Sequence, residues 1–283
     1  MTPTALALVL FAALLHAGWN AMVKAMDDRA GVLAAVSAAH AVLGLILVLS
    51  FPLPAIASWP SIAASTLLHY GYYILLFCAY RLGDLSQVYP ISRGLAPAVV
   101  ALSAVALSAV ALIGESLAPL GWIGVACVSV GVTILALQKG AVQASRAAVL
   151  FAICLGMLIA AYSVADGIGV RRSGNAFSYM GWLFLLEFPV PLTIALIRRQ
   201  TGGGFSPRVL GIGTIGGIAA VSAYGIVLYV KTIAPLGAVS AVRESSVIFA
   251  ALIGILWFGE RPIAARLLAA AVVSVGVMTI ASS

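Results

Sequence analysis

The hydrophobic positions of this chain form long continuous runs rather than an alternating or a one-sided pattern. The runs reach about 20 residues, the length that a helix needs to cross a bilayer, and short turns separate them. Because the runs do not alternate, they exclude a closed β-barrel. The pattern predicts ten transmembrane helices, near residues 3–24, 31–53, 60–80, 86–113, 117–138, 147–170, 175–197, 207–231, 237–258 and 262–282. We therefore predict an all-α polytopic membrane protein.

The composition is typical of a chain that faces lipid rather than water. Of the 283 residues, 63% are hydrophobic and 8% are charged, whereas about 25% of the residues in a soluble domain are charged. This shortage excludes a disordered chain, a coiled coil and a single soluble enzyme domain. The net charge of +7 is spread over the turns, so it does not indicate a nucleic-acid partner.

The two halves of the chain resemble each other. Two segments recur in the same order and at the same spacing: Ser129-Val130-Gly131-Val132 as Ser274-Val275-Gly276-Val277, and Gly114-Glu115 as Gly259-Glu260. This internal duplication predicts two five-helix repeats, over residues 1–140 and 141–283. Because five is an odd number, the second repeat is expected to lie inverted relative to the first. Inverted repeats place a substrate site near the middle of the membrane and permit alternating access.

Three motifs link the chain to a known family. They are His16-Ala17-Gly18-Trp19-Asn20 with Lys24, the Gly-Glu turns at 114–115 and 259–260, and Tyr80-Arg81-Leu82-Gly83-Asp84 leading into Tyr89-Pro90-Ile91-Ser92-Arg93-Gly94. With these motifs the chain resembles, over essentially its whole length, the drug/metabolite transporter superfamily in its ten-helix EamA-like form. The resemblance implies a carrier that exports or exchanges a small polar metabolite.

These features predict a secondary transporter of the inner (plasma) membrane that works by alternating access. We expect an amino acid or a similar zwitterion as the substrate, and two alternatives remain open. One is an efflux carrier for cationic drugs; the other, from a different class, is a membrane scaffold or lipid-pathway component without a transport cycle. The sequence has no GxSxG, HExxH, P-loop or DxD motif. We therefore expect no enzyme activity and no cofactor, and a gradient as the energy source, with protons as a candidate coupling ion.

The distribution of Lys and Arg predicts the orientation. Ten lie in odd-numbered loops: Lys24, Arg29, Arg81, Lys139, Arg146, Arg198, Arg199, Arg208, Arg261 and Arg266. Three lie in even-numbered loops: Arg171, Arg172 and Lys231. Because Lys and Arg favour the cytoplasmic side, this asymmetry predicts that both termini lie outside the cytoplasm. The family resemblance implies the opposite orientation.

Small residues in the fifth and tenth predicted helices permit close packing. They are Gly121, Gly124, Gly131 and Ala269 to Ala271. Such positions let two helix backbones approach, either within one chain or between two chains. We accordingly expect a monomer or a homodimer.

Five ionisable residues are predicted to lie within the bilayer, where each costs at least about 2.5–3.5 kcal/mol. They are Arg93, Asp166, Glu187, Arg243 and Glu244. Glu187 is the deepest, and the prolines at 189 and 191 should kink its helix. We expect Glu187 to face a hydrated cavity, as a proton carrier or as the partner of a cationic group, with an ion pair to Arg93 or Arg243 as the structural alternative.

Arg93 and Arg243 correspond to each other in the two repeats. They are expected to bind a carboxylate or phosphate from opposite sides of the midplane, or to pair with Glu187 and Glu244 as alternating gates; snorkelling to the interface is the simpler alternative. Tyr89 lies one helical turn before Arg93 and shares its face.

Further polar residues form stripes on the predicted helices. His16, Trp19 and Asn20 share one face of the first helix, and Tyr162 and Asp166 hold the matching positions of the sixth. These residues are candidates to line the substrate site, with ordinary helix packing as the alternative for the first stripe.

The third predicted helix carries an aromatic stripe. His69 and Tyr73 lie on one side of this helix, as a wall suited to an apolar or cationic part of a substrate. Tyr224 and Tyr229 could serve the site or the membrane interface. His40 is interpreted as an isolated core histidine.

Overall fold

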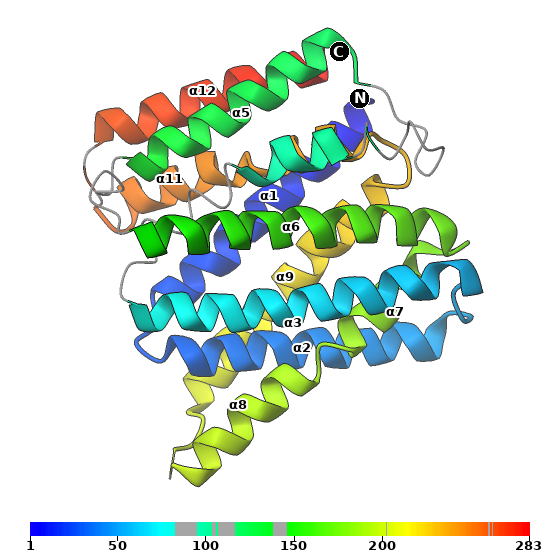
Figure 1. The fold of residues 1–283 in the computed structure, drawn as a ribbon. Coiled ribbons are helices and arrows are strands. Elements are labelled where there is room, and N and C mark those ends of the chain that lie inside the picture. Colours follow the sequence, from blue (N-terminus) through cyan, green and yellow to red (C-terminus); the bar gives the residue numbers. More distant parts are fainter. Residues whose placement is uncertain are drawn as a thin grey trace.

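The computed structural model describes residues 1–82, 95–103, 106, 117–137, 146–201, 203–259, 261 and 263–283. The described part is helical throughout, apart from its turns (Figure 1). The helices are α1 (Pro3–Lys24), α2 (Arg29–Ser50), the 3₁₀ helix η1 (Ile56–Ser58), α3 (Trp59–Leu82), α5 (Pro119–Leu137), α6 (Arg146–Arg172), α7 (Ala176–Leu185), α8 (Pro189–Gln200), α9 (Pro207–Val230), α10 (Leu236–Arg243), α11 (Ser246–Leu256) and α12 (Ile263–Ala281). Residues 95–103 are also helical.

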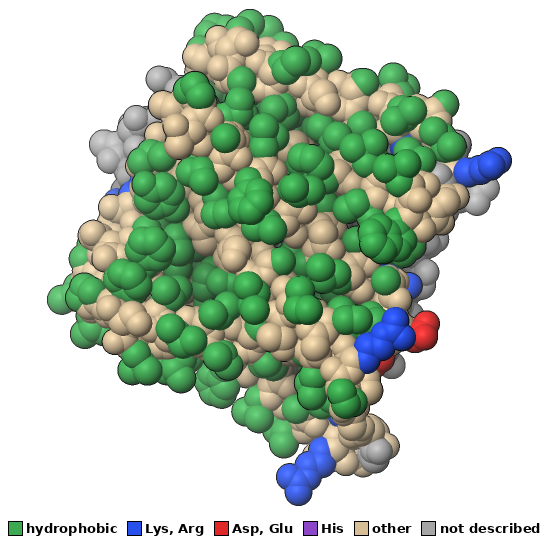
Figure 2. Space-filling model, turned by 180° about the vertical axis from the view of Figure 1, so that it is seen from behind, with side chains coloured by type: hydrophobic (Ala, Val, Ile, Leu, Met, Phe, Trp, Pro, Cys, Tyr) green, Lys and Arg blue, Asp and Glu red, His purple; other side chains and the backbone are tan. Residues whose placement is uncertain are grey.

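The long apolar helices confirm an all-α, multi-pass membrane protein. Six helical segments of the described residues are long and apolar enough to cross a membrane. Large hydrophobic side chains point outward, among them Ile56, Leu256 and Trp257, each at least 84% exposed. Figure 2 shows hydrophobic side chains spread over a whole face of the molecule, with Lys and Arg at its margins. Lipid tails are the solvent that such a surface requires.

Polar caps explain why several helices begin where the sequence predicts. Thr2 accepts a hydrogen bond from the Ala5 amide at 3.3 Å, and Ser206 accepts one from the Val209 amide at 3.2 Å. A proline follows each of these two caps at the first helical position, where its missing N–H costs nothing. The bounds of α1 and α9 therefore lie within one residue of the predicted spans 3–24 and 207–231.

Small residues set the tightest packing between helices. Helix α5 lies along α12, α1 and α2 pack on α9, α3 packs on α6, and α2 packs on α7 (Figure 1). A Cβ on Gly124 would lie 2.8 Å from the Gly276 carbonyl oxygen, and one on Gly131 would lie 2.9 Å from the Val273 amide nitrogen. The small residues of the fifth and tenth predicted helices thus pack against each other within one chain.

Two predicted spans are interrupted near their middle. The span 175–197 divides into α7 and α8, and the span 237–258 divides into α10 and α11. At both interruptions backbone amides bond three residues back, for example Phe188 to Leu185 at 3.1 Å and Ser245 to Val242 at 3.0 Å. Each interruption is therefore a tightened, 3₁₀-like turn. The first confirms the kink predicted from the prolines; the second was not predicted.

Both termini lie at the same end of the bundle (Figure 1). This placement agrees with an even number of crossings. The predicted span 86–113 lies mostly outside the described residues, and so do both residues of the Gly114-Glu115 turn.

Candidate functional site

Asp166 is the most deeply buried carboxylate at the centre of the bundle. It lies on α6 with no exposed surface. The hydroxyl of Tyr179 on α7 donates to its Oδ1 at 2.9 Å, and the hydroxyl of Tyr224 on α9 donates to its Oδ2. Three helices therefore meet at one carboxylate whose two oxygens both accept hydrogen bonds, the arrangement that a buried charge requires.

Tyr224 connects this carboxylate to a cation. The guanidinium carbon of Arg243, at the end of α10, lies 5.4 Å from the centre of the Tyr224 ring. This distance is within the range of a cation–π interaction. The same ring meets His69 of α3 edge-on, with a distance of 6.0 Å between ring centres. The Tyr224 hydroxyl thus bonds a carboxylate, and its ring contacts a guanidinium and an imidazole.

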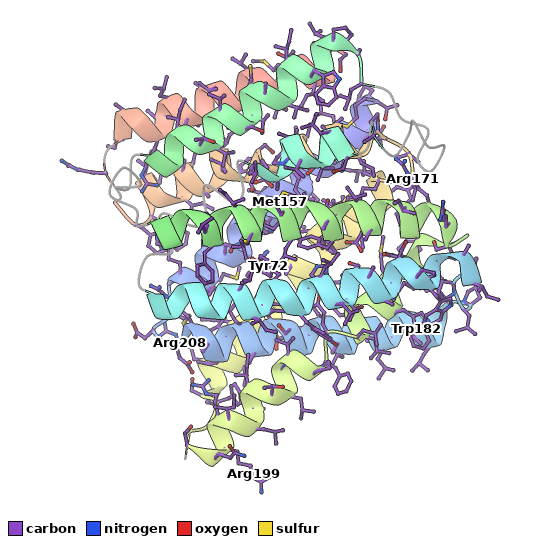
Figure 3. The ribbon with its side chains drawn as sticks, viewed as in Figure 1. Tyr72, Met157, Arg171, Trp182, Arg199 and Arg208 are labelled. Atoms are coloured by element: carbon purple, nitrogen blue, oxygen red, sulfur yellow. The ribbon has the colours of Figure 1, made fainter. Side chains whose placement is uncertain are left out.

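Aromatic rings of α3 and α6 extend the site into the first half of the chain. His69 stacks on Tyr162 of α6 with 4.2 Å between ring centres, and its Nδ1 bonds the Ser65 carbonyl oxygen at 2.8 Å. Tyr72, which lies between α3 and α6 in Figure 3, is 6.3 Å from Tyr162 and 5.7 Å from Tyr73. The aromatic wall predicted for the third helix is present and faces other helices.

Glu187 lies at the interruption between α7 and α8. It is 5% exposed. Its Oε2 lies 2.8 Å from Nδ1 of His40 on α2, and the Tyr73 hydroxyl donates to the same oxygen at 3.4 Å. His69 is a further electrostatic neighbour. A continuous series of polar and aromatic side chains therefore runs from His40 through Glu187, the α3 residues and Asp166 to Arg243.

A side chain supplies a hydrogen bond that the backbone next to Glu187 lacks. The 3₁₀-like turn directs the Val190 amide to the Glu187 carbonyl oxygen, at 3.0 Å, instead of to the Leu186 carbonyl oxygen. The Tyr70 hydroxyl donates to Leu186 in its place. An unbonded carbonyl at this depth would be costly, so Tyr70 stabilises the interruption.

A second polar cluster lies toward the end of the bundle that holds the termini. Lys231 is 1% exposed, and its Nζ donates to the carbonyl and hydroxyl oxygens of Ser163, both at 2.9 Å. Arg171, labelled in Figure 3, donates to the Lys231 carbonyl oxygen at 2.6 Å and to the Ala234 carbonyl oxygen at 2.9 Å. These bonds tie the turn between α9 and α10 to α6. Lys231 lies in this turn, as the sequence predicts, and its side chain is buried.

The structure brings together six of the predicted site residues. These are His69, Tyr73, Tyr162, Asp166, Glu187 and Arg243. Glu244 is also buried, 2% exposed, at the interruption between α10 and α11. Arg93 and Tyr89 lie outside the described residues.

The stripe on α1 is bonded within its own helix. Nε1 of Trp19 donates to Nδ1 of His16 at 3.3 Å, and the Asn20 side-chain amide donates to the His16 carbonyl oxygen at 2.7 Å. Trp19 packs against a hydrophobic cluster of α2 and α9 that includes Val36 and Ala220. These contacts agree with the helix-packing alternative for the stripe.

Sequence reasoning missed two members of the site. The interpretation of His40 as an isolated histidine is wrong, because it bonds Glu187. Tyr179 follows the polar turn before α7 and carries no motif, so nothing in the local pattern pointed to Asp166. A search for donors one helix away from each buried carboxylate would have included both, since buried charges need partners.

The described residues contain no group of three or more His, Cys, Asp or Glu side chains placed to hold a metal ion. The charged groups are instead spaced along the series, with rings between them. Such an arrangement can bind a small molecule through its charged ends and can hold a proton at its titratable members.

The fold and its apolar surface define a multi-pass α-helical membrane protein. Neither a family model nor a curated protein matches the chain. The fold resembles 28 chains of solved structures. One of them, described as a crystal structure of a protein, aligns over 99% of this chain and 99% of its own with a TM-score of 0.75 and 17% sequence identity. This similarity extends over the whole bundle and concerns the fold.

Proposed function

We propose that this protein is a secondary transporter of the inner membrane that exports or exchanges a small polar metabolite, an amino acid or similar zwitterion, by alternating access. The observation that carries this proposal is the series Asp166, Tyr224 and Arg243, in which the carboxylate is buried and the other two side chains are partly buried. Two opposite charges flank one aromatic ring inside an apolar bundle. Charged groups inside a membrane bundle mark substrate and ion pathways. A zwitterion has an ammonium group for the carboxylate and a carboxylate for the guanidinium.

The packing supports the inverted repeat that the sequence predicts. If the second five spans repeat the first, the pair α1 with α9 corresponds to the pair α6 with α3, and both pairs pack closely. The pairs α2 with α7 and α5 with α12 each map onto themselves, and both also pack closely. Inverted repeats of this kind enclose the substrate site at their interface.

The two interruptions supply places where the bundle can bend. Both lie near the middle of a span, and both border the site, one at Glu187 and the other at Glu244. A 3₁₀ turn within a helix often marks a functional hinge. Bending there would open the site to one side of the membrane while the uninterrupted helices stay packed.

The charges at the two ends of the bundle support the proposed orientation, with both termini outside the cytoplasm. Arg171 lies at the end that holds the termini, whereas Arg199 and Arg208 lie toward the other end (Figure 3). The sequence has ten Lys and Arg residues in the odd-numbered loops and three in the even-numbered loops, and this excess favours the cytoplasm for the odd-numbered side.

Efflux of cationic drugs is the second candidate, favoured by the aromatic wall and the buried carboxylates of Asp166 and Glu187. The two functions differ in what they require of Arg243. A zwitterion needs this guanidinium for its carboxylate, whereas a cation is bound by the rings and the carboxylates alone. A scaffold that does not transport requires neither the Arg243 guanidinium nor the carboxylates.

Counterflow in proteoliposomes tests these functions. Purified full-length protein is assayed with a panel of radiolabelled amino acids and, separately, with the cationic dye ethidium. We expect Arg243→Gln to reduce amino-acid counterflow about 10- to 100-fold, the equivalent of roughly 1.5–3 kcal/mol for a charged hydrogen bond. The matched control is Arg208→Gln, because Arg208 is exposed.

Three results contradict the proposal. Equal amino-acid counterflow in Arg243→Gln and in the wild type excludes the proposed substrate site. Ethidium flux without amino-acid flux indicates the drug-efflux function. No flux of any probe in the wild type indicates the scaffold.

A further inference from the structure

His40 and Glu187 form a buried pair that the substrate series Asp166, Tyr224 and Arg243 does not use. His40 comes from the middle of α2 and Glu187 from the interruption between α7 and α8. Their side chains are 13% and 7% exposed, and 2.8 Å separates Nδ1 from Oε2. The two residues lie 147 positions apart in the chain, so only the tertiary fold brings them together.

The second ring nitrogen of His40 is buried and has no hydrogen-bond partner among the described residues. With its proton on Nδ1, the neutral ring donates to the Glu187 carboxylate and leaves Nε2 as a buried lone pair. This nitrogen can accept one proton. The pair then changes from a net charge of −1 to zero, because an imidazolium faces a carboxylate.

The groups that face Glu187 come from two packed helices. From α2 the facing group is His40. From α3 they are His69, the Tyr73 hydroxyl, which donates to Glu187, and the Tyr70 hydroxyl, which donates to the neighbouring Leu186 carbonyl oxygen. Histidine is the side chain whose charge changes nearest to neutral pH. The carboxylate thus accepts a hydrogen bond from one tyrosine hydroxyl and lies near two imidazole rings.

The backbone at Glu187 can transmit this change of charge. The prolines at 189 and 191 keep the turn out of regular helical bonding, and the Tyr70 hydroxyl replaces the missing bond at Leu186. A charge change of one unit in the apolar interior alters the electrostatic energy of the pair far more than in water. The adjoining turn has 3₁₀-like bonds in place of regular α-helical ones.

We propose that the His40–Glu187 pair is the site that binds the coupling proton, taken up from one side of the membrane and released to the other during transport. This inference rests on the transport function proposed above and names its coupling ion. In each cycle one N–H bond forms at the pair and later breaks, and no electron is transferred. The substrate series binds the metabolite, and the pair responds to the pH gradient.

The first test needs no substrate. Infrared difference spectra of the protein in lipid are recorded across a pH titration, with the carboxyl and imidazole bands as readouts. We expect one joint transition in which both bands change. Both His40→Asn, which keeps a donor near the position of Nδ1, and Glu187→Gln should abolish it. The exposed control Asp27→Asn should retain it.

The second test uses the radiolabelled amino acids that show counterflow in the wild type. One coupled proton and a gradient of one pH unit correspond to about 1.36 kcal/mol, which sustains at most about tenfold accumulation. We expect wild-type protein to approach this ratio for one sign of the gradient. In His40→Asn and Glu187→Gln the ratio should fall to that of protein-free liposomes, whereas the exposed control Asp27→Asn should retain the wild-type ratio.

Each outcome of the two tests supports or overturns the role of the His40–Glu187 pair. Loss of both the joint transition and accumulation in the two variants supports the proposal. Gradient-driven accumulation that survives in Glu187→Gln overturns it, and so does a wild-type titration in which the two bands never change together. If no amino acid crosses the membrane in the wild type, coupling is overturned together with transport. A joint transition that persists in that case shows that the error lies in the transport function.

Discussion

Two of the buried carboxylates, Asp166 and Glu187, are held in different ways. Asp166 lies within the unbroken helix α6 and accepts hydrogen bonds from two tyrosines, which stay neutral near physiological pH. Glu187 lies at a helix interruption and bonds His40, and histidine is the type of side chain whose charge changes nearest to neutral pH. The comparison separates two roles that the sequence could not distinguish. A carboxylate with neutral donors on a rigid helix is suited to bind a fixed charge, and one with a titratable partner at a hinge is suited to exchange a proton.

Substituting Asp166 should have the largest effect. In Asp166→Asn, the amide nitrogen cannot accept the hydrogen bond of one tyrosine, so a buried hydroxyl is left without its acceptor. We expect counterflow and gradient-driven accumulation of amino acids to disappear together, with a loss of about 1–3 kcal/mol in stability. Counterflow at several pH values and thermal unfolding in detergent measure the two effects.

The pH dependence of that loss sharpens the comparison. The effect of Asp166→Asn should be equal at all pH values, because its partners do not titrate in the accessible range. If the variant still catalyses counterflow but loses accumulation, then Asp166 and Glu187 have the same role and the comparison fails.

Restoring a regular helix at Glu187 should have an intermediate effect. The double variant Pro189→Ala, Pro191→Ala returns two backbone donors, which would allow a regular helix to continue from α7 into α8. We expect a more stable protein with slower counterflow, because the bend next to Glu187 becomes harder to form. The control is Pro235→Ala, since Pro235 caps α10 outside the helix. Unchanged stability and counterflow in the double variant would show that the prolines do not maintain the interruption.

Asp28 is the partly exposed reference for Asp166 and Glu187, and the effect of its substitution should be the smallest. It caps α2 through the Gly31 amide, at 2.9 Å, and pairs with Arg198 at 2.7 Å. The hydrogen bond from Arg198 holds the pKa of Asp28 below its ordinary value of 3.8. Since asparagine also caps helices, Asp28→Asn should remove only the ion pair and cost less than about 1 kcal/mol.

The sign of the pH effect follows from the lowered pKa of Asp28. The ion pair contributes stability above the ordinary pKa and loses it as the pH falls through the lower, folded value. Thermal unfolding should therefore distinguish Asp28→Asn from the wild type at pH 6 and fail to distinguish them at strongly acidic pH. A difference that grows on acidification would contradict the ion pair.

The sequence was a good guide wherever a local rule operates. Continuous apolar runs predicted the helices, and Thr2 and Ser206 mark where two of them begin. The prolines after Glu187 predicted an interruption at the correct place. The interruption at Glu244 had a weaker signal, the Ser245-Ser246 pair, because serine pairs kink helices less regularly than proline does.

What the sequence by itself determined is the class of the protein and the identity of the residues that need a partner. Burying a charge in lipid is costly at any position, so Asp166, Glu187 and Arg243 could be recognised without knowing the fold. What only the tertiary structure decided is which partner each one has. His40 reaches Glu187 from α2, Tyr179 and Tyr224 reach Asp166 from α7 and α9, and Lys231 turns inward to Ser163. Hydropathy records how deep a residue lies, but partners depend on helix rotation and neighbours, which are set by packing between segments far apart in the chain.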